Sequence, residues 1–221
     1  MKISSRIETV LFKKYYFTYR YIDITISLRY IVSLITQLLF YLQHLSNKQT
    51  NNKPHEKNAM SKIKFSMTPA IRFLRDHQVA FSVHPYSYEE HGGTAHSAYC
   101  LGVDEHHVIK TLIMENDQRQ PLIVLMHGDR KVSTRELARL LGVKTIHPCD
   151  PATAHKHSGY LVGGTSPFGT RKSMPVYLEE SILELPLVYL NGGRRGLLVS
   201  LASTDVQRLL KPVLVNVAIK D

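Results

Sequence analysis

Gly159-Tyr-Leu-Val-Gly-Gly-Thr-Ser-Pro-Phe-Gly169 stands out in this chain because it holds four glycines and one proline in eleven residues and no charged side chain. So many glycines give too much conformational freedom for a helix or a regular strand. An ordinary solvated linker would carry more charge. The Gly163-Gly164 pair allows a positive φ or a close backbone approach, and Pro167 fixes the exit. The segment is either a tight surface turn or a loop whose backbone amides form a binding site.

Four segments, in one order and suitably spaced, resemble the YbaK family of aminoacyl-tRNA deacylases, which is related to the editing domain of bacterial prolyl-tRNA synthetases. The loop at residues 158–169 is similar to the signature loop of that family. Met67–Ile71 resembles the start of its N-terminal helix, Val108–Leu112 the strand that carries its lysine, and Asn191–Gly196 its late glycine-basic turn. The resemblance covers nearly all of the chain apart from its first third.

The order of strand and helix signals predicts an α/β fold with a mixed sheet. Short strands are interspersed with helices and include hairpins. No GxGxxG motif follows the first strand, so a dinucleotide-binding fold has no support. The resemblance implies in addition a largely antiparallel sheet, partly closed into a barrel and surrounded by short helices. Residues 61–221 are expected to form this deacylase-like domain.

Turn residues, caps and apolar runs place the individual elements. Helices are expected after the caps or cap candidates Thr68, Thr94, Ser133, Asp150 and Ser203. Strands are expected at Ala80–Val83, Val108–Met114, Pro121–Met126, Lys144–His147, Pro175–Leu178, Leu187–Leu190, Leu197–Leu201 and Val213–Val217. Ile71, Leu74, Arg75 and Val79 indicate a short amphipathic first helix, and the helix after Ser133 should turn Leu137, Leu140 and Leu141 inward.

Residues 1–60 differ from the rest of the chain and are expected to be an extension outside the family domain. Their uncharged run, Tyr30 to Gln43, is shorter than the roughly 20 residues of a membrane helix. No small-residue cleavage site of a signal peptide follows an apolar core. We expect a start assigned too far upstream, because Met60 and Met67 precede the family region. An interfacial membrane helix is the alternative.

The formal net charge of +10 suggests an anionic partner, but much of it lies in the extension. Residues 1–60 contain nine bases and three acids, which gives +6. The remainder has 19 bases and 15 acids, or +4. Nucleic-acid binding by the family region must therefore rest on local patches of charge rather than on a global field.

The two cysteines, Cys100 and Cys149, do not make a disulfide framework, and a reducing cytoplasm is the simpler location. Neither cysteine has a CxxC partner, and His155 and His157 do not stand at a recognisable ligand spacing from one. The sequence therefore predicts no metal site. No cofactor is expected either.

Lys110 is the exception in the apolar run from Val108 to Met114. From the pattern alone, it either reaches water from an edge strand or lines a pocket. The resemblance favours the pocket, because activity in the family depends on a lysine at this place. Lys110 is accordingly the residue expected to be catalytic, as a point charge that holds the terminal ribose or phosphate.

The resemblance implies a pocket between the glycine-rich loop, the strand with Lys110 and the late turn. The residues expected to bind substrate are Tyr86, Thr111, Gly163, Gly164, Thr165, Ser166, Pro167 and Gly193. Amides near Gly164 to Ser166 can donate to a developing oxyanion. The tRNA backbone is expected to contact Arg171, Lys172, Arg194 and Arg195.

No conventional hydrolytic triad can be assigned. Cys149 is the obvious nucleophile on chemical grounds, but the family has no catalytic cysteine there. Relatives that remove cysteine are thought to let the thiol of the substrate attack its own ester, so that the protein supplies shape and electrostatics. Two departures concern the amino-acid pocket. Leu198 stands where some relatives have an acid, and Gly92-Gly93-Thr94 replaces a phenylalanine.

The function expected from this resemblance is trans-editing: hydrolysis of mischarged tRNA, above all Cys-tRNA(Pro), with prolyl-tRNA synthetase as a second partner to be tested. One alternative is a tRNA- or oligonucleotide-binding module without activity. Another is a deacylase for a different small amino acid, such as Ala-tRNA(Pro), since one methylene contributes only about 1–3 kcal/mol to discrimination. A membrane-associated protein anchored through residues 22–45 is the third alternative.

Overall fold

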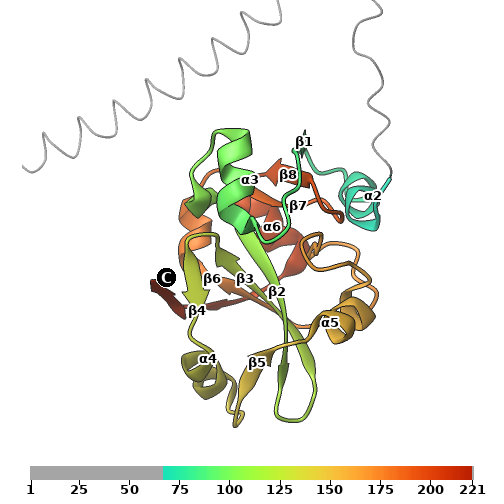
Figure 1. The fold of residues 1–221 in the computed structure, drawn as a ribbon. Helices are drawn as coiled ribbons and strands as arrows, with labels where there is room; N and C mark the ends of the chain where they lie inside the picture. Colours follow the sequence, from blue (N-terminus) through green and yellow to red (C-terminus); the bar gives the residue numbers. More distant parts are fainter. Residues whose placement is uncertain (1–66, 221) are drawn as a thin grey trace, which may run out of the picture. The chain divides into compact units, whose positions relative to one another are not determined.

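The computed structural model describes residues 67–220 of the chain (Figure 1). The expected extension at residues 1–60 lies outside the described residues, so its boundary and role stay predictions. No helix between residues 67 and 220 has the length and apolar character needed to cross a bilayer.

A five-stranded mixed sheet forms the centre of the described region. Its strand order is β5-β2-β3-β6-β9. The bounds are Ile146–Pro148 for β5, Ile109–Asn116 for β2, Pro121–His127 for β3, Val176–Glu179 for β6 and Val213–Val215 for β9. β2 pairs antiparallel with β3 and β5, whereas β6 pairs parallel with β3 and β9. The predicted α/β fold with a mixed sheet is thus confirmed.

Two smaller antiparallel sheets contain the remaining strands of the described region. β8 (Leu197–Leu201) lies between β1 (Ser82–Pro85) and β7 (Val188–Asn191). β4 (Arg130–Val132) pairs with β10 (Ala218–Lys220), a strand that the sequence analysis missed. A single parallel bridge, Val108 to Tyr189, joins the chain just before β2 to β7. The three sheets of residues 67–220 do not close into a barrel. The bridge between Val108 and Tyr189 is the part of the expected partial closure that the described residues form.

Between residues 67 and 220, five α-helices of eight or nine residues surround the sheets: α2 (Pro69–Asp76), α3 (Gly93–Leu101), α4 (Thr134–Leu141), α5 (Pro151–Ser158) and α6 (Ser203–Leu210). Two 3₁₀ turns, Glu105–His107 and Glu180–Glu184, lie between elements. Three predicted caps are confirmed, because the side chains of Thr68, Ser133 and Asp150 accept hydrogen bonds from amides in the first turns of α2, α4 and α5.

Two predicted caps are wrong because tertiary partners compete for the hydroxyl groups. The Thr94 hydroxyl donates to Glu105 Oε1 at 2.7 Å instead of capping α3. The Ser203 hydroxyl donates to the Leu185 carbonyl, and α6 begins without a side-chain cap. Two further helix predictions fail in part: α2 ends at Asp76, before Val79, although Val79 is buried, and Leu140 of α4 is 58% exposed although Leu137 is buried.

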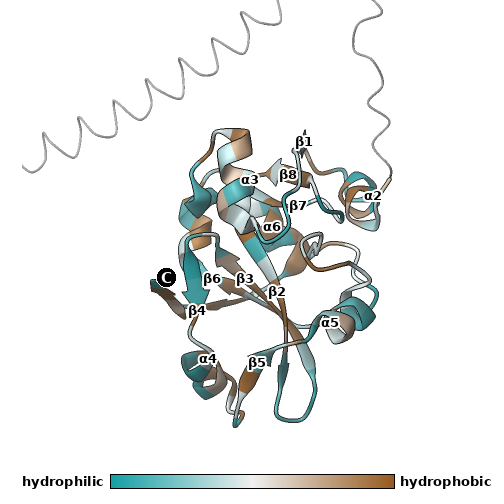
Figure 2. Cartoon of the chain, viewed as in Figure 1, coloured by the Kyte–Doolittle hydropathy of each residue, from teal (hydrophilic) through white to brown (hydrophobic). Residues whose placement is uncertain are grey.

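Apolar side chains bury both faces of the central sheet, as is typical of near-continuous hydrophobic strands. Ile123 and Leu125 of β3 belong to one core cluster, while Val124 and Met126 belong to another. Figure 2 shows the hydrophobic colour concentrated on the central strands and the hydrophilic colour on the outer side of α4. Phe168 of the glycine-rich loop is fully buried in the first cluster. The second half of that loop is therefore part of the core.

Candidate active-site cleft

A cleft of about 610 Å³ runs along an open edge of β2. β5 pairs with β2 only from Met114 to Asn116, and β7 meets the chain only at Val108. Between these contacts, residues 110–112 of β2 have no strand partner on that side among the described residues. The gap is walled by α3, the loop after β1, part of the glycine-rich loop and the turn after β7.

Thr111 lies at the middle of this open edge. The Ile113 carbonyl accepts a hydrogen bond from the Cys149 amide, so the backbone groups of Ile113 point toward the β5 side. In an antiparallel strand the direction of the backbone amide and carbonyl reverses at each residue and repeats at every second residue. Thr111 lies two residues before Ile113, so its amide and carbonyl point in the same direction as those of Ile113, into the gap. The Thr111 hydroxyl oxygen is buried and has no partner. Thr111 thus turns its amide and carbonyl to the gap, and its hydroxyl is a further polar group without a partner.

Lys110 lines the same cleft and is half-buried. Its ammonium donates to the Arg130 carbonyl at 2.9 Å. That bond holds one end of the side chain in place and leaves two of the three ammonium N–H groups for a ligand. The lysine therefore belongs to the wall of a pocket, one of the two positions that the sequence pattern allowed.

The glycine-rich loop contributes only its first part to the cleft. Gly163 and Thr165 line it, whereas Ser166 and Pro167 are buried behind it. The Gly164 amide is already donated to the Leu161 carbonyl at 2.8 Å. Of Gly164 to Ser166, whose amides were expected to act as oxyanion donors, only Thr165 lines the cleft.

Asn191 fixes the loop to the late turn, a role that the sequence analysis missed. Its side-chain amide donates to the Gly163 carbonyl at 2.9 Å, and its side-chain oxygen accepts from the amides of Gly193 at 2.9 Å and Arg194 at 3.2 Å. The two backbones also touch, since a Cβ on Gly164 would lie 2.9 Å from three backbone atoms of Arg194 and the next residue. Asparagine before a glycine pair is a common turn signal, which is why the pattern suggested only a hairpin.

The late turn brings one predicted tRNA-binding cation to the cleft. Arg195 lines it, donates to the Val162 carbonyl at 2.9 Å, and lies 5.1 Å from the ring centre of Tyr88. Arg194 and Gly193 line a smaller neighbouring pocket of about 360 Å³ instead. Gly193 therefore does not border the main cleft.

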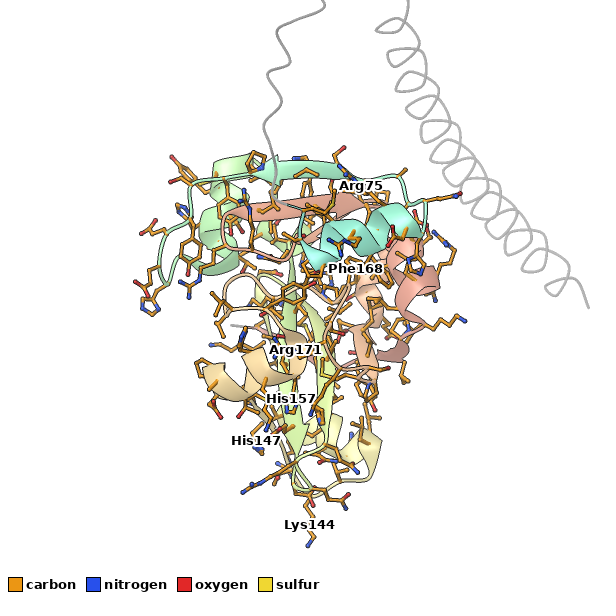
Figure 3. All side chains as sticks on the ribbon, turned by 90° about the vertical axis from the view of Figure 1, so that its right-hand side faces the viewer. Arg75, Lys144, His147, His157, Phe168 and Arg171 are labelled. Carbon is orange, nitrogen blue, oxygen red and sulfur yellow. The ribbon has the colours of Figure 1, made fainter. Side chains whose placement is uncertain are left out.

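The other two predicted cations lie away from the cleft lining. Arg171 and Lys172 are exposed after the glycine-rich loop, and their amides donate to the carbonyls of Ser158 and His157 at the end of α5. Figure 3 shows Arg171 beside this helix. Of the four predicted tRNA contacts, Arg195 alone lines the main cleft.

The far wall of the cleft carries Tyr86 and Leu198. The Tyr86 amide donates to the Gly196 carbonyl at 3.0 Å, and burial raises the pKa of its phenol. Leu198 is only 4% exposed and packs with Val108 and Ala98 of α3. An apolar side chain thus occupies the place where some relatives are expected to have an acid.

Neither cysteine is set up as a nucleophile in the cleft. Cys149 lines it, but burial, followed by the charges of Glu115 and Asp150, raises the pKa of its thiol to about 11. A thiol with that pKa holds its proton at neutral pH and attacks poorly.

Cys100 takes part in a chain of contacts that resembles a hydrolytic triad. Its sulfur lies 3.4 Å from His96 Nε2, and His96 Nδ1 lies 2.9 Å from Glu89. The same Nε2 lies only 2.7 Å from the Ser87 carbonyl, which can only accept a hydrogen bond, so the ring must donate there. Cys100 is also exposed and absent from the cleft lining. The ring is therefore not placed to take a proton from a nucleophile in the cleft.

Residues 90–209 match the sequence pattern of the aminoacyl-tRNA editing domain. That match spans more than half of the chain. The chain belongs to the aminoacyl-tRNA editing domain family. The resemblance to the YbaK family is thereby confirmed, and the cleft described above lies mostly within the matched segment of this editing domain.

Known proteins similar to this editing domain agree with the assignment. The proposed Cys-tRNA(Pro)/Cys-tRNA(Cys) deacylase EbsC of Enterococcus faecalis is 25% identical over 155 residues, which are 70% of this chain and 94% of EbsC. Proline–tRNA ligase of Brachyspira hyodysenteriae is 26% identical over 86 residues, 39% of this chain and 15% of the ligase. A crystal structure of a proposed trans-editing enzyme for prolyl-tRNA synthetase shares the fold, with a TM-score of 0.60, 20% identity, and coverage of 71% of this chain and 99% of that one.

Proposed function

We propose that this editing domain hydrolyses the ester of a mischarged tRNA, with Cys-tRNA(Pro) as its preferred substrate, in the cleft along β2. The observation that carries the proposal is the open strand edge of β2 inside the cleft, which both Lys110 and Thr111 line, with the Thr111 hydroxyl left without a partner. Unpaired polar groups in a cleft cost free energy unless a ligand satisfies them. An aminoacyl group with its amine, carbonyl and ribose oxygens can do so.

In this proposal Lys110 holds the terminal ribose or its phosphate, while Thr111 and the Thr165 amide orient the aminoacyl group. The thiol of the substrate attacks its own carbonyl carbon, and the bond from that carbon to the ribose oxygen breaks. The thiol proton passes to the ribose oxygen, which leaves as the tRNA hydroxyl. Water then opens the cyclic thioester to give free cysteine. The protein contributes proximity and electrostatic stabilisation, in keeping with a cleft that lacks a reactive nucleophile.

Arg195 lines the cleft together with Lys110, and in this arrangement it would contact the phosphate backbone of the acceptor end. Arg194 at the neighbouring pocket extends the same path, while Arg171 and Lys172 would meet the tRNA farther along. The partner is thus a mischarged tRNA, in the cytoplasm where tRNA is charged. Docking on prolyl-tRNA synthetase is a separate prediction.

The test compares the loss of Cys-tRNA(Pro), Ser-tRNA(Pro) and Ala-tRNA(Pro) in the presence of the full chain. The proposal predicts fast loss of the cysteinyl ester and little acceleration of the seryl ester, because a hydroxyl attacks far less readily than a thiol. Equal loss of all three would show that the substrate thiol is not used. Binding of Cys-tRNA(Pro) without a rate above spontaneous hydrolysis would instead identify a binding module.

A further inference from the structure

Glu115, Cys149 and His157 lie together beside the cleft although they come from three separate elements. The antiparallel register of β2 and β5 sets Glu115 opposite His147, two residues before Cys149. The Cys149 amide donates to the Ile113 carbonyl at 3.0 Å, and α5 follows directly and returns over β2 to place His157. The sequence could not show this group, because 42 residues separate Glu115 from His157.

The ligand atoms of the three side chains lie within 4.8 Å of one another. His157 Nε2 and Glu115 Oε1 are 2.7 Å apart, and the two side chains are only 7% and 13% exposed. Figure 3 shows His157 between α5 and the central strands. A thiol, an imidazole and a carboxylate thus share one enclosed space next to the cleft.

The imidazole of His157 is left incompletely satisfied in this arrangement. One ring nitrogen meets Glu115, while the other, Nδ1, is buried without a partner. Nε2 faces Glu115 and is therefore the nitrogen that an ion shared by these side chains would take, so the unpartnered Nδ1 does not by itself mark the site.

A second group of metal-type side chains provides an internal comparison. His106, His127 and Asp129 also have ligand atoms within 4.8 Å of one another. Both nitrogens of His127 are occupied, by the His106 carbonyl at 2.7 Å and the Ser181 hydroxyl at 2.9 Å. His106 in turn bonds to Asp129 at 2.8 Å. That group is a closed hydrogen-bond network, whereas in the group at Cys149 only Glu115 and His157 are bonded to each other, and no hydrogen bond joins the thiol to either of them.

We propose that Glu115, Cys149 and His157 bind a divalent metal ion of the zinc class. Sulfur, nitrogen and carboxylate oxygen are the ligands of zinc, and a set that includes sulfur and nitrogen disfavours magnesium and calcium. Zinc bonds of about 2.0–2.3 Å separate the ligand atoms by about 3–4 Å. Small side-chain movements from the observed 2.7 Å and at most 4.8 Å suffice.

Three protein ligands leave one zinc position open. Cys149 borders the cleft, so the ion lies at its wall. An ion there links β2, the end of β5 and α5. Because its three ligands come together only in the folded chain, the ion binds the native state and so stabilises it against unfolding. The proposal concerns binding of the ion and does not depend on deacylation.

Cobalt(II) is the probe of choice, because a thiolate ligand gives it a charge-transfer absorption that histidine and carboxylate ligands do not. The full chain, freed of metal with a chelator, is titrated with cobalt(II) and then with zinc. We expect one equivalent to produce the thiolate band, zinc to displace it, and zinc to raise the melting temperature. The chain has only two cysteines, so two variants assign the band.

Cys149→Ser should abolish the band, whereas Cys100→Ser, which changes the exposed thiol, should keep it. His157→Gln should weaken cobalt binding by more than about tenfold, and the matched change His155→Gln on the same helix should not. Circular dichroism checks that each variant is folded. A wild-type protein without a thiolate band, or a band that persists in folded Cys149→Ser, would overturn the proposal.

Discussion

The side-chain amide of Asn191 donates a 2.9 Å hydrogen bond to the backbone carbonyl of Gly163, which joins the turn after β7 to the glycine-rich loop. Its side-chain oxygen at the same time accepts from two amides of the turn. One asparagine therefore sets the position of both segments that border the cleft beside Thr111.

Asn191→Ala should lower the free energy of unfolding by about 1–3 kcal/mol, because it removes these hydrogen bonds and leaves backbone groups unpaired. It should also raise KM for the tRNA substrate more than it lowers kcat, because the glycine-rich loop is no longer held beside the turn after β7. Urea unfolding and steady-state deacylation measure the two effects. Asn216→Ala, which removes an exposed bond to Glu180, is the matched control and should change stability by less than about 0.5 kcal/mol. Equal effects of the two variants would contradict the role of Asn191.

Gly164→Ala should destabilise the protein by about 2–3 kcal/mol, because the new Cβ would lie 2.9 Å from the Arg194 backbone. Gly102→Ala separates this clash from backbone strain. Gly102 has a φ of +65° and open space around it, so alanine there should cost only about 1 kcal/mol. Thermal unfolding of both variants makes the comparison. A Gly164→Ala protein as stable as Gly102→Ala would show that the loop and the turn can separate easily.

Lys110→Met should reduce kcat/KM for Cys-tRNA(Pro) by about a hundredfold, the usual effect of removing one electrostatic contact to a reacting group. The fold should survive, because the methionine keeps the apolar stem and only the bond to Arg130 is lost. Lys144→Met is the control: it removes the same charge at the end of the described region opposite α2 (Figure 3). A control that loses as much activity would indicate a general charge effect rather than a role for Lys110.

Thr111→Val should have opposite effects on stability and binding. Its hydroxyl has no partner in the free protein, so replacement by a methyl group should leave the free energy of unfolding unchanged or slightly higher. If the hydroxyl meets the aminoacyl group, kcat/KM should fall about 10- to 100-fold, the effect of one lost polar contact. Loss of stability together with loss of activity would assign Thr111 to the fold instead.

Acid should weaken the native state partly through His127. Burial lowers the pKa of this ring below its ordinary value of 6.5. The native state therefore binds fewer protons than the unfolded state below that pH, and stability falls as the pH drops from about 6.5, by at most about 1.4 kcal/mol per unit. Denaturant unfolding at pH 7.5 and 5.5 should show a smaller loss in His127→Gln than in the wild type. Identical losses would contradict this account.

Local signals in the sequence predicted most of the elements. Caps at Thr68, Ser133 and Asp150 act within one helical turn, and β8 has the predicted bounds Leu197–Leu201. Predictions failed where distant partners decide the outcome. Thr94 bonds to Glu105 rather than to its own helix, and β10 forms only because β4 offers an edge.

In the candidate site, too, local features could be predicted from the sequence, whereas features that depend on distant partners could not. Lys110 and the glycine-rich loop could be singled out from residue types, because a lysine in an apolar strand and a glycine-rich uncharged loop are unusual by themselves. The burial of Ser166 and Pro167 could not be predicted from the sequence, because it follows from the packing of Phe168 against α2. There the Phe168 ring lies 5.8 Å from the ring of Phe73. The contact between Asn191 and Gly163 could not be predicted either, because these residues are 28 positions apart in the chain.

The most direct test of the central claim is the rate of Cys-tRNA(Pro) deacylation by the full chain, measured against spontaneous hydrolysis and against Lys110→Met. We predict that the wild type strongly accelerates deacylation. The Lys110→Met protein should fold and yet lose most of this acceleration. No acceleration by the wild type, or full activity in folded Lys110→Met, would contradict the assignment of deacylation to the cleft along β2.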